Sequence, residues 1–339
     1  MPLARFLQAA LYPFSLLYQA ASHVDGRKKQ RRAFRASLSV ISVGNISVGG
    51  TGKTQLVELL IRTIGKQHAV LVLSRGYGRE NPTNELWTSS EALPDPERFG
   101  DEPAMLARSI RYGGLAVGRD RAELLRQFEQ RFKGAVAILD DGFQHRQVAR
   151  DIDIVIVDDA TARPPHLLMP AGRLREPPQS LARADLIVAT SPPARTFAES
   201  FIDHDRIFDA RTVAGPLRRF RDRTAVDSAY CSVILITAIA RPERVVESLR
   251  EIGVQVIEHI RYRDHHRYVE SDLSSILEAA SRHPDALIAT TAKDAVKLGR
   301  FDEIADQLVE IETTMHVADE ERFLRVINTA LAQRQQLKS

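Results

Sequence analysis

A glycine-rich stretch between residues 43 and 60, VGNISVGGTGKTQLVELL, carries the residue types that bind phosphate. Glycines let the backbone approach an anion, and the helix that follows offers unpaired N–H groups and a partial positive charge. Lys53 can neutralise the outer phosphates of a nucleotide, and the hydroxyl of Thr54 suits Mg²⁺. The spacing predicts an ATP-binding loop made of Ser47, Val48, Gly49, Gly50, Thr51, Gly52, Lys53 and Thr54.

The loop departs from the usual pattern Gly-x-x-x-x-Gly-Lys-Thr at its first position, where Ser47 replaces glycine. Gly49, Gly50 and Gly52 keep the backbone adaptable, and we expect Ser47 to have a geometry that does not need glycine. The alternative is a plain glycine-rich turn in an α/β protein.

Two carboxylates end the stretch AVAILDD, directly after an apolar run. A carboxylate at the end of a strand beside a phosphate loop holds Mg²⁺, directly or through water. Asp140 and Asp141 both have this position, so either one is a candidate metal residue. The other would then cap a helix or lie in a solvated loop.

Apolar segments rich in Val and Ile alternate with helical patterns along most of the chain. This alternation predicts an α/β fold with a parallel sheet, as in P-loop nucleotide hydrolases, and functional residues at the carboxyl ends of the strands. The pattern breaks near residues 201–227, where we expect Arg206–Arg223 to form a connecting hairpin, and resumes as a second, smaller α/β unit. The predicted divisions are 1–35, a nucleotide-binding domain at 36–215 and a C-terminal domain at 216–339.

The first residues predict an amphipathic helix, kinked or restarted near Pro13. The apolar segment Phe6–Ala21 is shorter than the roughly 20 residues of a spanning helix. Three interpretations compete: a signal peptide, a helix packed on the protein's own core, and a helix in the membrane interface. The six basic residues in Arg27–Arg35 oppose export and favour the interface beside anionic headgroups.

The net charge of +3 is too small to indicate a nucleic-acid partner, and the single cysteine excludes an intrachain disulfide. We predict no obligate protein partner. TTAKDA does not match the Asn-Lys-x-Asp stretch with which GTPases read the base. A P-loop ATPase that switches a protein partner is the alternative function, although Val48 occupies the position where such ATPases carry lysine.

Seven stretches occur in the order found in one enzyme family: VGNISVGGTGKT, LSRGYGR, FGDEPAML, ILDDGFQH, LLMPAGRLREP, RDHHRY and TTAKDAVKL. Together they resemble the tetraacyldisaccharide 4'-kinases of Gram-negative bacteria over about residues 5 to 330. The family also has a small hydroxyl residue in place of the first loop glycine. The resemblance implies ATP- and Mg²⁺-dependent phosphorylation of the 4'-hydroxyl of a tetraacylated glucosamine disaccharide 1-phosphate. It also implies a peripheral or monotopic enzyme at the cytoplasmic face of the inner membrane.

The resemblance further implies that Asp101 is the base that accepts the proton of the sugar hydroxyl, paired with His265. These residues come from different predicted domains, so we expect the active site between them. Glu102 is a further candidate for the Mg²⁺ shell. The candidate phosphate- or sugar-binding residues are Arg75, Gln144, His145, Arg173 and Arg175, the arginines because a guanidinium suits bidentate phosphate contacts.

Two stretches depart from the family pattern. TAIARPER lacks the glycines commonly found there, and Ala292 replaces the acid that usually stands in TTAKD. No site is therefore assigned in TAIARPER, and Lys293 and Asp294 receive no role.

Overall fold

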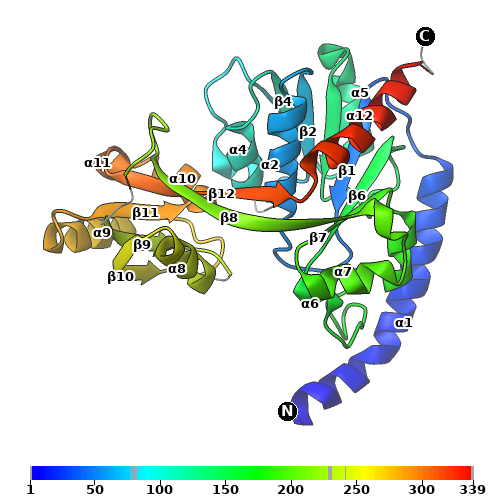
Figure 1. The fold of residues 1–339 in the computed structure, drawn as a ribbon, viewed down its shortest axis with the longest axis horizontal. Helices are drawn as coiled ribbons and strands as arrows, with labels where there is room; N and C mark the ends of the chain where they lie inside the picture. Colours follow the sequence, from blue (N-terminus) through cyan, green and yellow to red (C-terminus); the bar gives the residue numbers. More distant parts are fainter. Residues whose placement is uncertain (1, 78, 80–81, 228–230, 241, 337–339) are drawn as a thin grey trace.

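The computed structural model describes residues 2–77, 79, 82–227, 231–240 and 242–336. Within these residues the strands form one 12-stranded sheet in the order β10-β9-β11-β12-β8-β7-β6-β1-β5-β2-β4-β3 (Figure 1). The strands are β1 Ser39–Gly44, β2 Val70–Ser74, β3 Glu85–Thr88, β4 Gly113–Val117, β5 Val136–Asp140, β6 Ile152–Val157, β7 Leu186–Ala189, β8 Ile207–Arg219, β9 Ser232–Thr237, β10 Gln255–Arg261, β11 Leu287–Thr291 and β12 Leu308–Val317.

Helices cover the sheet and connect its strands. They are α1 Pro2–Arg31, α2 Lys53–Ile64, α3 Pro96–Phe99, α4 Asp101–Ala107, α5 Arg121–Phe128, α6 Asp159–Ala162, α7 Pro192–Glu199, α8 Pro242–Glu251, α9 Glu270–Arg282, α10 Ala292–Leu298, α11 Asp302–Ala305 and α12 Glu320–Gln336. The predicted α/β fold is confirmed. The strands β1, β5 and β6 are buried along their whole length, as expected for continuous Val and Ile runs covered on both faces.

The sheet consists of two sets of parallel strands. One set runs from β8 to β4, with β3 antiparallel at the edge; the other comprises β10, β9, β11 and β12. The sets meet where β8 and β12 pair antiparallel, from Val309 opposite Arg219 to Val317 opposite Ala210. Figure 1 shows these two long strands crossing from one group of helices to the other.

The predicted hairpin at Arg206–Arg223 is wrong for most of its length, because β8 is a single strand of 13 residues. Only its end turns back: Arg219 donates its backbone N–H to Thr224 O at 2.9 Å, and Val226 donates to Leu217 O at 2.8 Å. The strand lacks a continuous apolar run because much of it is exposed. Its partner β12 lies about a hundred residues later, so no local pattern reveals the pairing.

The C-terminal helix α12 packs on the half of the sheet that carries the glycine loop. Phe323, Ile327 and Leu331 lie in one buried cluster with Ile41 of β1 and Leu56 of α2. The chain thus returns to its first half after completing β12.

Helix α1 is uninterrupted at Pro13, so the predicted restart there does not occur. One side of the helix faces the body of the protein: the Ser15 hydroxyl donates to Leu168 O at 2.9 Å, and Tyr18 packs against a buried cluster. The other side is apolar and open, with Phe14 58% and Leu17 68% exposed. No helix in the described residues is long and apolar enough to cross a bilayer.

Candidate active site

The glycine loop lies between β1 and α2, as predicted. Gly49 and Gly52 have φ angles of 113° and 93°, which residues with a Cβ rarely adopt. Gly52 caps α2 without a side chain, so the first N–H groups of the helix stay available to an anion. The Asn45 amide donates to the Thr51 hydroxyl at 3.0 Å, and the Gln144 amide donates to Asn45 O at 2.8 Å. These bonds fix the backbone of the loop.

Ser47 anchors the loop at the position where the common motif has glycine. Its φ is not positive, so the backbone does not require glycine there. The Thr161 hydroxyl donates to Asp158 Oδ1 at 2.6 Å, so the Ser47 hydroxyl is the donor in its 2.7 Å bond to Thr161 Oγ1. Val48 N–H donates to Arg173 O at 2.8 Å. Ser47 therefore does not provide the backbone freedom of a glycine; its side chain instead fixes the loop through a buried hydrogen bond.

An acidic cluster faces the loop at the end of β5 and the start of α4. The hydroxyl of Thr54 donates to Glu102 Oε2 at 3.2 Å, and Lys53 Nζ lies 3.6 Å from Asp141 Oδ1. Asp140 is buried and accepts a hydrogen bond from the Ser74 hydroxyl at 2.8 Å. All four predicted metal residues are thus gathered around the start of α2.

The two aspartates differ in electrostatics. Burial, followed by the charges of Glu102 and Asp141, raises the pKa of Asp140 to about 6. Burial also opposes the ionisation of Asp141, but Lys53 and Arg175 outweigh it and lower the pKa of Asp141 below its usual value. Arg175 Nη1 lies 2.6 Å from Asp141 Oδ2. Asp140 forms no ion pair with a described residue, and the nearby charges of Lys53 and Arg121 do not offset its burial.

This difference predicts opposite effects of two matched substitutions on stability without Mg²⁺ and nucleotide. The raised pKa of Asp140 means that its ionisation costs stability, increasingly from about pH 4 to 6 and constantly above pH 6. Asp140→Asn should stabilise the protein at pH 8 by roughly 2–3 kcal/mol and have little effect near pH 4. Asp141→Asn should destabilise at pH 8, because its ionised form is favoured in the folded state, and this loss should fade as the pH falls.

Thermal unfolding of both variants at pH 4 and pH 8 measures these changes. Equal shifts in the two variants at pH 8 would contradict the opposite pKa shifts of Asp140 and Asp141.

Asp101 and His265 lie close together, although 163 residues separate them in the chain. Asp101 opens α4 after Gly100, and His265 Nδ1 lies 3.4 Å from Asp101 Oδ2. His265 has a φ of 61° and donates its backbone N–H to Ala238 O at 3.2 Å, so the loop after β10 presents the imidazole to α4. His266 turns away and contacts Asp272 at 2.9 Å.

The remaining predicted residues divide into two groups. Gln144 and His145 support the fold of the site: His145 Nε2 accepts the Arg121 N–H at 3.2 Å, and burial, with the charge of Arg121, lowers the pKa of His145 to about 4. Arg75 and Arg173 are exposed. Arg75 forms no hydrogen bond or ion pair with another described residue, and Arg173 donates to Val48 O at 3.3 Å.

Arg121 is not among the residues predicted from the sequence, yet it is 4% exposed and donates to Asp140 O at 3.3 Å. Its position was a usable signal, because Arg121 begins α5 shortly after β4, and β4 pairs with β2 beside the site. Lys293 receives no role from the sequence, but its Nζ lies 3.1 Å from His265 Nε2.

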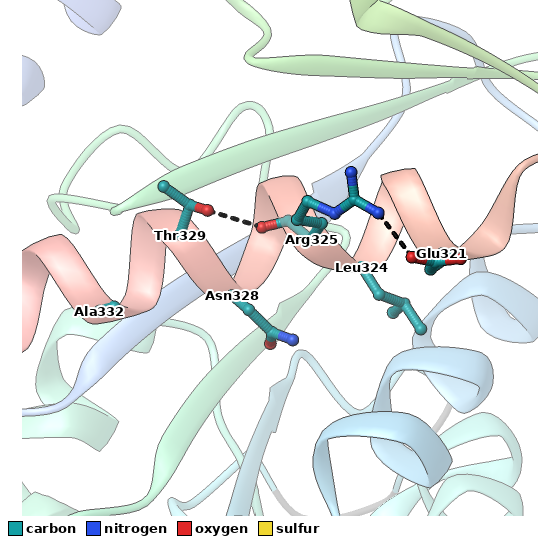
Figure 2. Close-up of a pocket in the computed structure, with 6 residues that line it drawn as sticks. All are labelled: Glu321, Leu324, Arg325, Asn328, Thr329 and Ala332. Atoms are coloured by element: carbon teal, nitrogen blue, oxygen red, sulfur yellow. Dashed lines mark hydrogen bonds and ion pairs between the residues drawn. The ribbon is translucent and has the colours of Figure 1, made fainter.

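A hollow of about 470 Å³ lies elsewhere, along α12 (Figure 2). Figure 2 shows Arg325 reaching Glu321, at 2.5 Å, and the Thr329 hydroxyl bonded to Arg325 O, at 2.8 Å. Leu324, Asn328 and Ala332 complete the lining. None of the predicted site residues contributes to this hollow, so the chemistry of the side chains, and not the shape of the surface, locates the candidate site.

Comparisons with known proteins identify the family. The family model for tetraacyldisaccharide-1-P 4'-kinase matches residues 7–332. A tetraacyldisaccharide 4'-kinase of Syntrophus aciditrophicus is 33% identical, covering 93% of this chain and 90% of the relative. That of Koribacter versatilis is 36% identical, covering 87% and 90%.

Among solved structures, LpxK from Aquifex aeolicus in complex with ATP superimposes with a TM-score of 0.81 and 27% identity. The match covers 96% of this chain and 99% of that one. The kinase resemblance noted in the sequence is therefore confirmed over nearly the whole chain. The chain belongs to the tetraacyldisaccharide-1-P 4'-kinase family, and it is a kinase.

Proposed function

We propose that this kinase transfers the γ-phosphate of ATP to the 4'-hydroxyl of a tetraacylated glucosamine disaccharide 1-phosphate. The observation that carries the proposal is the position of Asp101 beside the phosphate loop. Asp101 and Glu102 share the first turn of α4, and the Thr54 hydroxyl of α2 donates to Glu102. A base held this close to the loop can meet a hydroxyl that attacks a loop-bound phosphate.

The chemistry assigns a role to each group. The sugar oxygen forms a bond to the γ-phosphorus while the bond from phosphorus to the bridging oxygen of ADP breaks. Asp101 accepts the proton of the hydroxyl, because an alcohol is a poor nucleophile until its proton is removed. The α2 N-terminus and Lys53 stabilise negative charge on the transferring group. Arg75 and Arg173 are both exposed, and Arg173 contacts the loop, so both are available for phosphate of either substrate.

Mg²⁺ fits the acidic cluster. Asp141 Oδ1 accepts no hydrogen bond from a described residue, and the burial of Asp140 outweighs the cations near it and raises its pKa. No three His, Cys, Asp or Glu side chains of the described chain are arranged as a ready-made metal site. Mg²⁺ typically uses one or two carboxylates plus phosphate and water, so no such cage is required. Thr54, Asp140, Asp141 and Glu102 would hold the ion, which when bound neutralises phosphate charge.

The reaction is tested by incubating the protein with γ-labelled ATP, Mg²⁺ and purified disaccharide monophosphate. We expect label in the lipid, at the 4' position, with one ADP formed per phosphate transferred. ATP hydrolysis that is independent of the lipid, and stimulated instead by a protein or by dimerisation, would contradict the kinase reaction and favour a partner-switching ATPase.

We further propose that α1 places the enzyme on the cytoplasmic face of the inner membrane. Its outward side carries Phe14, Leu16, Leu17 and Val24, each 49–68% exposed. The exposed basic residues of Arg27–Arg35 follow directly, where they can meet anionic headgroups. An apolar helix side beside a basic segment is typical of a helix that lies in the interface.

Replacing Phe14 and Leu17 with glutamate should weaken membrane binding strongly without unfolding the protein, because neither side chain is buried in it. Burial of each apolar side chain is worth roughly 1.5–3 kcal/mol, so the partition coefficient should fall by about 10²-fold or more. Co-sedimentation with vesicles containing anionic phospholipid measures it. The matched control replaces the exposed Gln19 and Gln67 with glutamate, which adds the same charge and changes neither the apolar residues nor the basic segment.

Two further observations decide this prediction. High salt should reduce binding only in part, because apolar burial is insensitive to screening. Equal binding of the Phe14/Leu17 variant and the Gln19/Gln67 control would show that α1 is not the anchor.

A further inference from the structure

Helix α10 places two lysines, Lys293 and Lys297, one helical turn apart beside the Asp101–His265 pair. The helix packs against α4, which begins with Asp101. Figure 1 shows α10 in the left-hand group of helices, with α8, α9 and α11, and α4 in the other group. The contact between α10 and α4 therefore joins the two halves of the molecule.

The ammonium group of Lys297 is fixed by Asp294 and His266, and it faces Asp101. Its side chain is 10% exposed, and its Nζ lies 3.0 Å from Asp294 Oδ1 and donates to His266 O at 3.1 Å. Asp294 is fully buried and is itself fixed, because its Oδ2 accepts the Ala238 N–H at 2.9 Å. The same ammonium nitrogen lies 3.5 Å from Asp101 Oδ2. A buried lysine needs carboxylates, and here one of them is the proposed base.

Lys293 acts on the other member of the pair. Its Nζ lies 3.1 Å from His265 Nε2 and 3.3 Å from Asp264 Oδ1. An ammonium group has donors only, so His265 Nε2 is the acceptor in this contact. The proton of the neutral imidazole then sits on Nδ1, the nitrogen that faces Asp101 Oδ2 at 3.4 Å. Lys293 thereby selects the tautomer whose N–H faces Asp101.

We propose that Lys293 and Lys297 are positioning residues that orient the carboxylate of Asp101 for proton transfer. Lys297 and His265 both occupy the Oδ2 side. Oδ1 has no partner among the described residues and is left to receive the proton of the acceptor hydroxyl. This inference rests on the proposed function, since it requires Asp101 to be the base. It also gives the TTAKDAVKL stretch a role in phosphate transfer that does not involve binding the nucleotide.

The test is a pair of double-mutant cycles on kcat at saturating ATP and lipid. Lys297→Met should lower kcat on the order of tenfold, with the Kd for ATP and the KM for lipid within about twofold of the parent. In an Asp101→Asn background, where no base remains to be oriented, the same substitution should change kcat by less than about twofold. Lys293→Met should likewise lower kcat on the order of tenfold in the parent, and should change kcat by less than about twofold in a His265→Ala background.

The Asp101→Asn background and two companion variants distinguish a lost orientation of Asp101 from structural damage. Lys297→Met leaves Asp294 buried without its cation, so Lys297→Met combined with Asp294→Asn removes both charges and should show the same loss of kcat. Lys297→Arg should recover part of the activity. The control Lys66→Met removes an exposed lysine that follows α2 and should leave kcat unchanged.

Three outcomes would overturn the inference. In the first, both lysine variants keep the parent kcat. In the second, their losses are equally large in the Asp101→Asn and His265→Ala backgrounds, which indicates a structural role. In the third, Asp101→Asn is itself fully active, which overturns the assigned base of the proposed function together with this inference. An inactive Asp101→Asn beside active lysine variants would overturn the inference alone.

Discussion

Asp101→Asn is expected to lower kcat by about 10²–10⁴-fold and to leave ATP affinity nearly unchanged. The substitution keeps the size of the side chain and removes its ability to accept a proton. Nucleotide is expected to be held by the N–H groups of the loop, by Lys53 and by the metal residues around Thr54, none of which is Asp101. The measurement combines kcat at saturating substrates with an independent Kd for ATP.

His265→Ala should produce a loss of the same kind, because His265 Nδ1 contacts the carboxylate at 3.4 Å. The double variant should be far less impaired than the product of the single losses, since a coupled pair acts as one unit. His266→Ala is the matched control, because the side chain of His266 contacts Asp272 and not Asp101. Fully multiplicative losses would disprove the pairing. A large loss of ATP affinity in Asp101→Asn would place this carboxylate among the metal residues.

Lys53→Ala is expected to reduce phosphate transfer by about 10²–10³-fold or more while the protein stays folded. The ammonium group supplies charge to the transferring phosphate, and its contact with Asp141 at 3.6 Å contributes little to the fold, because Arg175 remains on the same carboxylate. Transfer of labelled phosphate and the melting temperature are measured on the same preparation.

Lys66→Ala is the control for Lys53, because Lys66 is exposed just beyond the end of α2 and has no contact with the loop. Turnover in Lys53→Ala close to that of the control would rule out the glycine loop as the phosphate site. A fall in melting temperature large enough to explain the loss would instead assign Lys53 a structural role.

Local sequence was sufficient for the glycine loop and the elements on either side of it. Thr54 lies seven residues beyond Ser47, and the glycines, the lysine and the helix are contiguous, so their geometry depends on backbone rules that act over one turn. The buried strand ending at Asp140 was readable for the same reason, since a Val and Ile run between two helical patterns has few alternatives. The order of seven motifs indicated the family, which the comparisons confirm.

Tertiary structure decided which distant residues meet. The Ser47 side chain is bonded to Thr161, and Asp101 is contacted by His265 and Lys297. Each of these partners is more than a hundred residues away in the chain. The strand β8 was mistaken for a hairpin because its partner β12 lies far along the chain. The physical reason is common to these cases. A periodic pattern reports which face of an element is buried, whereas a contact between elements depends on the whole packed sheet, which no single segment encodes.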